Sequence, residues 1–533
     1  MTDPGARPSA PAAEPERFHV EPPTEPLSEP SGPDASLGEA AVSGSLWTLA
    51  QVLVVKLASL GGTLALMHLL APEEFGVATL AFNLQNMVVL LQPFTLGDVL
   101  LARPKDLARV SGTAHRLALL TSLFFLIATV AAGPLAAHSY QIPALVFGCA
   151  VASLRPLADW SMMLPLARLR AQLRFKAISA IDMMCMIGTT LTSVAMAWLR
   201  AGFVSVLLPQ IVFTSVRAWF YRRAAPAPPS PRWVPEEARP LFRGFLLSGL
   251  GQYVHGALIA ITPLVLGAFT GQREVGWYTM AFALSAQINT LAGFSMGLVL
   301  QPIFAQMAHD TLRQSAAFLR ACRVIATLAM PICLLQVMLA PAAFRVFLPA
   351  KWEGAIVLAQ ILSIGQAFFF CINPAMGLLK AQGRFAAFMN WQTIQLAVVG
   401  SLMVAAGFLW RHAPLVPIVL IGGLYHAISG PIGVWICVRG RGFSVGSSLD
   451  IFLRPLAIAI ASVVPLGLAL ASWIPQTRWG DLALMVALPL ASLPIFVLLV
   501  RRFDVSAAQD CGRLLAGGLR RLRRSRGAAE ARG

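Results

Sequence analysis

Long apolar segments recur along the chain from about residue 44 to residue 500, separated by short polar stretches. Each is about 20 residues long, the length with which an α-helix crosses the hydrocarbon core of a bilayer. The segments are rich in Leu and Ala, without the short alternation of a membrane β-barrel. We predict an all-α, polytopic membrane protein of about 14 transmembrane helices. The expected spans are 44–68, 76–101, 117–136, 142–164, 177–198, 202–220, 244–268, 278–302, 320–340, 354–379, 386–409, 414–437, 454–473 and 482–500.

The composition agrees with a membrane protein and excludes a soluble domain. Of the 533 residues, 57% are hydrophobic and only 12% are charged, whereas soluble domains carry about 25% charged residues. An aqueous fold could not bury so much apolar surface.

The net charge of +17 could indicate a nucleic-acid partner, but the distribution of the positive residues along the chain argues against one. If the N-terminus is cytoplasmic, 32 of the 41 Lys and Arg residues lie on the inner side, 6 lie in outer loops and 3 lie within spans. Cytoplasmic loops of membrane proteins carry such an excess of positive charge. We therefore expect a multi-pass protein of the bacterial inner (plasma) membrane with both termini in the cytoplasm, and no nucleic acid as partner.

A segment near the start of the chain recurs 200 positions later. Between residues 74–100 and 274–300 there are 11 identities without a gap. The first copies are Glu74, Gly76, Thr79, Ala81, Phe82, Leu84, Leu91, Phe94, Gly97, Val99 and Leu100. The offset spans six helices, an even number, so both copies insert in the same orientation. This predicts two six-helix lobes related by a parallel pseudo-two-fold repeat, with the substrate site between them.

The repeat and the polar stretches divide the chain into six parts. A Pro-rich, acidic N-terminal segment without an apolar core is expected to be a disordered cytoplasmic tail. A Pro-rich stretch joins the lobes as a polar linker, two extra helices follow the second lobe, and a basic tail ends the chain. The expected parts are 1–41, the tail; 42–220, the N-terminal lobe; 221–243, the linker; 244–437, the C-terminal lobe; 438–500, helices 13 and 14; and 501–533, the basic tail.

Three motifs carry a resemblance to a known family. They are LLAPEEFG at residues 69–76, LARLRAQLRFK at residues 166–176 and EVGWY at residues 274–278. With the helix count and the two-lobed pattern, they make the chain similar to the polysaccharide flippases of the MOP exporter superfamily over roughly residues 40–500.

The resemblance implies a substrate and a mechanism. The cargo would be a polyprenyl-pyrophosphate-linked oligosaccharide, moved from the inner to the outer leaflet by alternating access, in exopolysaccharide, capsule or O-antigen biosynthesis. Membrane lipids and the polysaccharide polymerase and export machinery would be the further partners. We expect no catalytic residues, no cofactor and no metal. No Gly-rich phosphate loop or His/Cys metal cluster occurs in the sequence, and the seven scattered cysteines are expected to be apolar packing residues.

Charged residues inside predicted spans are the first candidates for the site. Lys56 lies near the middle of the first span and Arg155 within the fourth, and each costs about 2.5–3.5 kcal/mol at the bilayer centre on insertion scales. Asp159 lies one turn after Arg155, so the two can form an i,i+4 ion pair. One interpretation is that Arg155 or Lys56 attracts the pyrophosphate. The other is that the Arg155–Asp159 pair only stabilises helix packing.

Uncharged polar residues are the second group of candidates. In the family that the chain resembles, the first two helices of each lobe border the central cavity, and hydroxyl-rich cargo needs polar groups to cross the membrane. Ordinary hydrogen bonding between helices is the alternative for each of these residues, and His255 is better explained as a packed, hydrogen-bonded histidine than as a proton-coupling site. The candidates are Asn83, Gln85, Asn86, Gln252, Tyr253, His255, Gln287 and Asn289.

Other functions remain open at this level. Every expected outer loop is short, which disfavours a glycan polymerase or ligase with an external catalytic loop. A multidrug or lipid II exporter of the same superfamily is the main competitor, because a fold does not determine its cargo.

Overall fold

The computed structural model describes residues 58–90, 92–101, 107–172, 174–226, 233–287, 310–382 and 384–512, and the single residues 304 and 307. All of these belong to one unit that spans Ala50–Arg520. Their regular elements are all helices, as the apolar pattern predicts. The helices are α2 (Pro72–Val88), α3 (Pro93–Leu101), α4 (Leu107–Tyr140), α5 (Ala144–Ala152), α6 (Arg155–Ala171), α7 (Phe175–Trp198), α8 (Val204–Ala224), α9 (Pro235–Phe269), α10 (Gln272–Ser285), α12 (Thr311–Phe347), the 3-10 turn η2 (Ala350–Trp352), α13 (Ala355–Phe369), α14 (Ile372–Ala381), α15 (Phe385–Leu409), α16 (Leu415–Val438), α17 (Val445–Trp473) and α18 (Arg478–Phe503).

The described helices have the length and the surface of membrane spans. Nine of those in the described part of the chain are long and apolar enough to cross a bilayer, and the shorter apolar segments Ala58–Leu69 and Tyr253–Phe269 add to them. On α4, Leu120, Phe124 and Ile127 each expose more than 60% of their surface, which suits contact with lipid chains. The chain is an integral membrane protein. The total of 14 spans stays a prediction.

Three expected spans each contain a break between two helices, although Ala355–Leu379 as a whole has the length and composition of one membrane span. The span 76–101 is divided into α2 and α3, the span 142–164 into α5 and α6, and the span 354–379 into α13 and α14. A proline lies at or just after the start of each second helix: Pro93, Pro156 and Pro374. Proline cannot donate a backbone hydrogen bond and disfavours a helical residue before it, but it is tolerated in a first helical turn.

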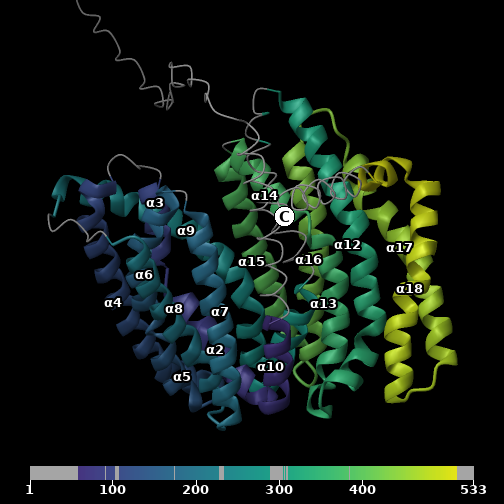
Figure 1. The fold of residues 1–533 in the computed structure, drawn as a ribbon, viewed down its shortest axis with the longest axis horizontal. Coiled ribbons are helices and arrows are strands. Elements are labelled where there is room, and N and C mark those ends of the chain that lie inside the picture. The colour runs from purple at the N-terminus through teal and green to yellow at the C-terminus, as the bar shows by residue number, and fades with distance from the viewer. Residues whose placement is uncertain are drawn as a thin grey trace, which may run out of the picture. The chain divides into compact units, whose positions relative to one another are not determined.

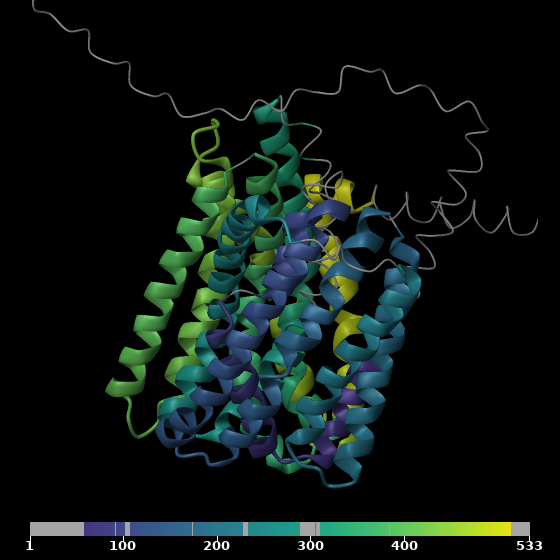
Figure 2. The ribbon, with the colours of Figure 1, turned by 90° about the vertical axis from the view of Figure 1, so that its left-hand side faces the viewer.

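The helices from α3 to α8 pack mainly against one another, with α6 and α7 both against α8, α4 against α5, and α3 against α6 (Figure 1 and Figure 2). In the second half of the chain, α13 packs against α16 and α12, and α15 against α9 and α16. Helices α17 and α18 pack against each other and against α12, where Figure 1 shows them in yellow. That these two helices are additions to a six-helix lobe stays a prediction.

Ion pairs attach these last two helices to α12. The guanidinium of Arg345 in α12 donates to both carboxylate oxygens of Asp481 in α18, at 2.8 and 2.7 Å. Arg323 in α12 pairs with Asp450 in α17 at 3.0 Å. Bidentate pairs of this kind add geometric specificity as well as energy. Helices α12, α17 and α18 are therefore joined by charge as well as by apolar packing.

Helices α2 and α10, which carry the two copies of the repeated segment, pack closely against each other. The Thr279 hydroxyl donates to the Thr79 hydroxyl at 3.0 Å. A Cβ added at Gly76 would collide with the Gln272 carbonyl, and one added at Gly276 would collide with the Pro72 carbonyl. The contacts are reciprocal at the 200-residue offset, as a local two-fold axis between the helices requires. The repeat of the whole lobes stays a prediction.

Both ends of the predicted linker 221–243 are helical. Helix α8 continues to Ala224, and α9 already begins at Pro235. Pro235 at the first helical position and the acidic Glu236 and Glu237 in the first turn are typical of a helix start. Residues 227–232 of the linker lie outside the described part of the chain.

Candidate functional site

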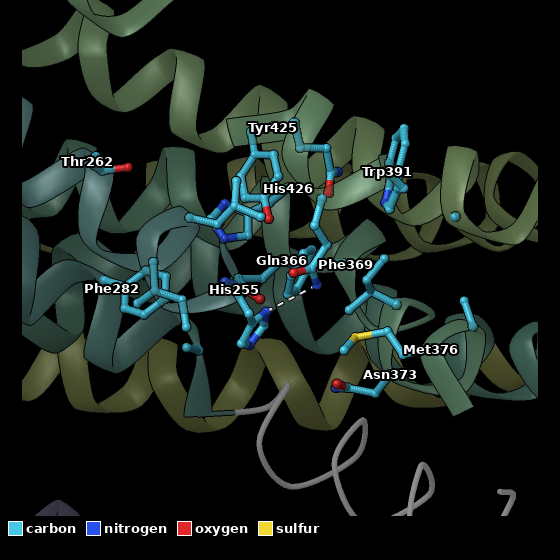
Figure 3. Close-up of a pocket in the computed structure, with 18 of the residues that line it drawn as sticks. His255, Thr262, Phe282, Gln366, Phe369, Asn373, Met376, Trp391, Tyr425 and His426 are labelled. Atoms are coloured by element: carbon cyan, nitrogen blue, oxygen red, sulfur yellow. Dashed lines mark hydrogen bonds between the residues drawn. The ribbon is translucent and has the colours of Figure 1, made fainter. Parts of the chain in front are cut away.

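Helices α9, α10, α13, α14, α15 and α16 surround a cavity of about 260 Å³ in the second half of the chain (Figure 3). Polar side chains from five of these helices line it beside aromatic rings. They are His255 and Thr262 of α9, Gln366 of α13, Asn373 of α14, Gln392 and Gln395 of α15, and His426 of α16. Buried polar groups inside a membrane helix bundle are costly, so their concentration at one cavity marks it as a candidate binding site.

Aromatic rings form one side of this cavity. Tyr278 and Phe282 of α10 are stacked, with their ring centroids 6.0 Å apart and their planes at 22°. The His426 ring of α16 lies 4.8 Å from Phe369 and 4.8 Å from Tyr425, measured between centroids. Tyr278 shares a side-chain hydrogen bond with Thr262. The cavity therefore offers flat apolar faces with polar groups next to them.

Two polar atoms at α15 have no hydrogen-bond partner. The Gln392 side chain is 4% exposed; its amide nitrogen lies 3.4 Å from Nδ1 of His255, and its carbonyl oxygen Oε1 is unpaired. The indole Nε1 of Trp391, whose ring lies at the cavity (Figure 3), is unpaired as well. A buried polar atom without a partner costs about 1–3 kcal/mol. A bound ligand that accepts from the indole and donates to the amide oxygen would recover this energy.

His426 is held by its own helix. Its Nδ1 lies 2.7 Å from the Gly422 carbonyl oxygen, which can only accept, so Nδ1 carries the proton. In the neutral ring, Nε2 is then left as an acceptor. His426 is 7% exposed and is packed among three aromatic rings, those of Phe282, Phe369 and Tyr425.

The described part of the cavity wall is made of uncharged and aromatic side chains. Among the described residues that line it, none is Asp, Glu, Lys or Arg. An isolated ion would find no compensating charge there. The wall suits an uncharged ligand with hydroxyl or amide groups.

Arg155 lies in the first half of the chain, at the first position of α6. Its Nε is 3.8 Å from Oδ2 of Asp159, which is the predicted i,i+4 pair. The guanidinium also lies over the Phe82 ring of α2, 5.7 Å from its centroid, a cation–π distance. The side chain is 40% exposed. Arg155 is thus oriented by a carboxylate and an aromatic ring, with part of its charge accessible.

The predicted polar residues of α2 have different surroundings. The Asn83 amide donates to the Thr79 carbonyl of its own helix at 2.8 Å. Gln85 is 2% exposed, with an unpaired Oε1, and Asn86 is half-buried. The Tyr253 hydroxyl of α9 donates to the Met87 carbonyl at 3.0 Å and so joins α9 to α2.

The remaining predicted residues are placed only in part. Gln287 follows α10 and is half-buried. Gln252 is part of α9, but its side chain lies outside the described part of the structure, as do Lys56 and Asn289 entirely. Among the predicted residues whose side chains the structure describes, only His255 lines the cavity. Arg155 lies over the Phe82 ring and pairs with Asp159, and Asn83 is in the same helix as Phe82. None of these roles is tested by the geometry.

Most cavity residues were absent from the sequence prediction. Its uncharged candidates came only from the first two helices of each lobe, whereas Gln366, Asn373, Trp391, Gln392 and His426 come from α13–α16. Their amides and histidine inside otherwise apolar spans were visible as a signal, since polar residues at membrane depth point to function.

Comparison with known proteins identifies the family of this chain. A family model described as a polysaccharide biosynthesis protein matches residues 65–357, more than half of the chain. The chain belongs to this family. The match confirms the predicted resemblance to the polysaccharide flippases of the MOP exporter superfamily.

Two relatives of this polysaccharide biosynthesis protein match over most of its length. Teichuronic acid biosynthesis protein TuaB of Bacillus subtilis (strain 168) is 20% identical over 486 residues, which cover 88% of this chain and 97% of the relative. Succinoglycan biosynthesis transport protein ExoT of Rhizobium meliloti (strain 1021) is 23% identical over 400 residues, which cover 73% and 75%.

Solved structures share its fold. The lipid II flippase MurJ in an inward closed conformation superposes with a TM-score of 0.67 at 10% identity, covering 86% of this chain and 99% of MurJ. An inward-facing multidrug resistance MATE family transporter of the MOP superfamily gives a TM-score of 0.57 at 13% identity, covering 74% and 96%. At these identities the likeness establishes the fold alone.

Proposed function

We propose that this protein is a flippase that translocates polyprenyl-pyrophosphate-linked oligosaccharide from the inner to the outer leaflet of the bacterial plasma membrane. The main support is the family match over residues 65–357, combined with a fold shared with transporters over most of the chain. The relatives named for teichuronic acid biosynthesis and succinoglycan transport support a glycan as cargo. The product would enter exopolysaccharide, capsule or O-antigen synthesis, together with polymerase and export machinery.

In this proposal, Arg155 attracts the pyrophosphate. It is a partly exposed cation in a membrane helix, and the break between α5 and α6 places it at a helix start. Discontinuous helices in transporters direct their positive N-terminal ends at anionic substrate groups. Lys56 is the second predicted cation, and the polar residues of α2, α9 and α10 would accompany the sugars.

The α2–α10 contact provides the outer closure of an alternating-access cycle. Under the predicted topology both helices begin at the outer surface, and their first turns hold the reciprocal glycine contacts. An ion pair between Glu73 and Arg273, with 3.4 Å between Oε1 and Nε, lies at the same end. Separation of these first turns would open the site to the outer leaflet.

A deletion strain tests the proposal. Loss of the protein should abolish a surface polysaccharide and leave its lipid-linked precursor on the cytoplasmic side, and the gene supplied in trans should restore both. Lipid II export is the competing function, because a fold does not determine its cargo. Arrest of cell-wall growth with intact surface polysaccharide would favour that competitor and contradict the proposal.

A further inference from the structure

We infer that the cavity between α9, α10 and α13–α16 binds one uncharged sugar residue of the cargo and so selects among glycans. The inference rests on the proposed function and assigns part of the recognition to a place distant in sequence from Arg155. The lipid pyrophosphate would be recognised by cationic groups, and the sugar by this cavity.

The charge of the cavity excludes the other parts of the cargo. No Lys or Arg is among the described residues that line it, so a pyrophosphate would be desolvated there without a counter-charge. No Asp or Glu is among them either, so a coupling cation would lack a carboxylate ligand. A neutral molecule with hydroxyl groups has neither problem.

The unpaired atoms of α15 match a sugar hydroxyl. A hydroxyl group both donates and accepts. Oε1 of Gln392 needs a donor, and the indole nitrogen of the adjacent Trp391 needs an acceptor. Vicinal hydroxyls of one pyranose ring could satisfy both atoms.

The rings beside these atoms suit the rest of a sugar. The faces of aromatic rings carry negative partial charge, and the C–H bonds on one side of a pyranose carry positive partial charge. Phe282 and Phe369 have such rings at the cavity (Figure 3), and Tyr278, stacked with Phe282, lines it as well. A ligand with one apolar face and a hydroxyl rim fits this arrangement better than a hydrocarbon chain, which would leave the amides unpaired.

The size limits the ligand to a single ring. Pockets for drug-sized ligands have volumes of roughly 300–1,000 Å³, and this cavity has about 260 Å³. It would therefore hold one sugar residue of an oligosaccharide rather than the whole glycan.

The test compares two ligands that share the anionic lipid and differ in the sugar. The full-length protein would be purified in detergent, and binding would be measured for the lipid-linked precursor extracted from the deletion strain and for polyprenyl pyrophosphate without sugar. The variants are Gln392→Met, which removes the amide, and Trp391→Phe, which keeps an aromatic ring and removes the N–H. Ile394→Ala on the exposed side of α15 (57% exposed) is the matched control.

We expect each cavity variant to weaken binding of the precursor roughly threefold to tenfold, the size of one lost hydrogen bond, and to leave binding of polyprenyl pyrophosphate within about twofold. The control should match the wild type for both ligands. Unchanged precursor binding by both variants, or equal loss for both ligands, would overturn the inference. If the wild type binds neither ligand, the proposed function itself fails. Size-exclusion chromatography of each variant verifies folding, and Trp391→Phe remains informative if Gln392→Met does not fold.

Discussion

Arg155 combines two contacts that have different consequences for function. Its pair with Asp159 at 3.8 Å is compatible with a purely structural role, whereas its 40% exposure and its place at the start of α6 leave charge available to a substrate. Breaking a fully buried pair costs about 3–5 kcal/mol because it leaves an unpaired charge. The cost here should be smaller, since Arg155 is partly exposed.

We predict that Arg155→Gln reduces glycan export at least about tenfold. The double variant Arg155→Gln with Asp159→Asn should recover any protein abundance that the single variant loses, without restoring export. Removing both charges eliminates the unpaired carboxylate but not the need for a cation. The measurement is surface polysaccharide normalised to membrane protein level. Export restored together with abundance would make the pair a packing device and remove Arg155 from the site.

The sequence predicted some residues of the site and not others for a physical reason. Polar residues within apolar segments are evident from the sequence, and His255 was found in this way. The face that such a residue presents depends on helix packing, which periodicity does not determine when a helix is apolar on all sides. Tyr253 therefore joins α9 to α2, while His255, two positions later, reaches the cavity.

At the level of helices, the contact between α2 and α10 depends on two glycines. Gly76 and Gly276 let each helix approach the backbone carbonyl of the other, so a methyl group at either position must separate them. Overpacking of this kind costs about 1–3 kcal/mol. The added methyl group destabilises only the arrangement in which the outer ends of the two helices touch. Separated helices would not meet at these positions.

We predict that Gly76→Ala shifts the protein toward an outward-open state. In a Thr79→Cys background, the added thiol should react faster with a membrane-impermeant maleimide applied from outside. Gly61→Ala is the control, since a Cβ there meets nothing within 4 Å. Equal labelling of the Gly76→Ala, Gly61→Ala and parent proteins would contradict an outer closure at this contact.

Helix existence was predictable, and helix continuity was not. Apolar length gave α4, α7, α15 and α16 close to their observed places. The divisions at Pro93, Pro156 and Pro374 were not assigned, because proline is also tolerated within membrane helices: α4 continues through Pro134. Whether a proline bends or divides a helix depends on partners for the freed carbonyl groups, and these belong to neighbouring helices.

At the scale of the whole molecule, the positive charge predicts the orientation in the membrane. A cysteine introduced at Pro228 in the linker should react with an impermeant reagent only after the inner membrane is permeabilised. A cysteine introduced at Gln476, between α17 and α18, should react in intact spheroplasts. The reverse pattern would invert the topology and with it the assignment of the α2–α10 contact to the outer side.

Reconstitution tests whether this protein moves a lipid-linked glycan between leaflets. The purified protein would be the only protein in liposomes that contain the precursor extracted from the deletion strain. An impermeant glycosidase would be added outside the liposomes, and the rate at which inner-leaflet glycan becomes accessible to it would be measured. The measurement would be made once with a proton gradient and once with a sodium gradient. We expect the glycan to become exposed much faster in liposomes with the protein than in protein-free liposomes. We also expect lipid II to move no faster than the precursor. Exposure at the protein-free rate under both gradients would contradict the account.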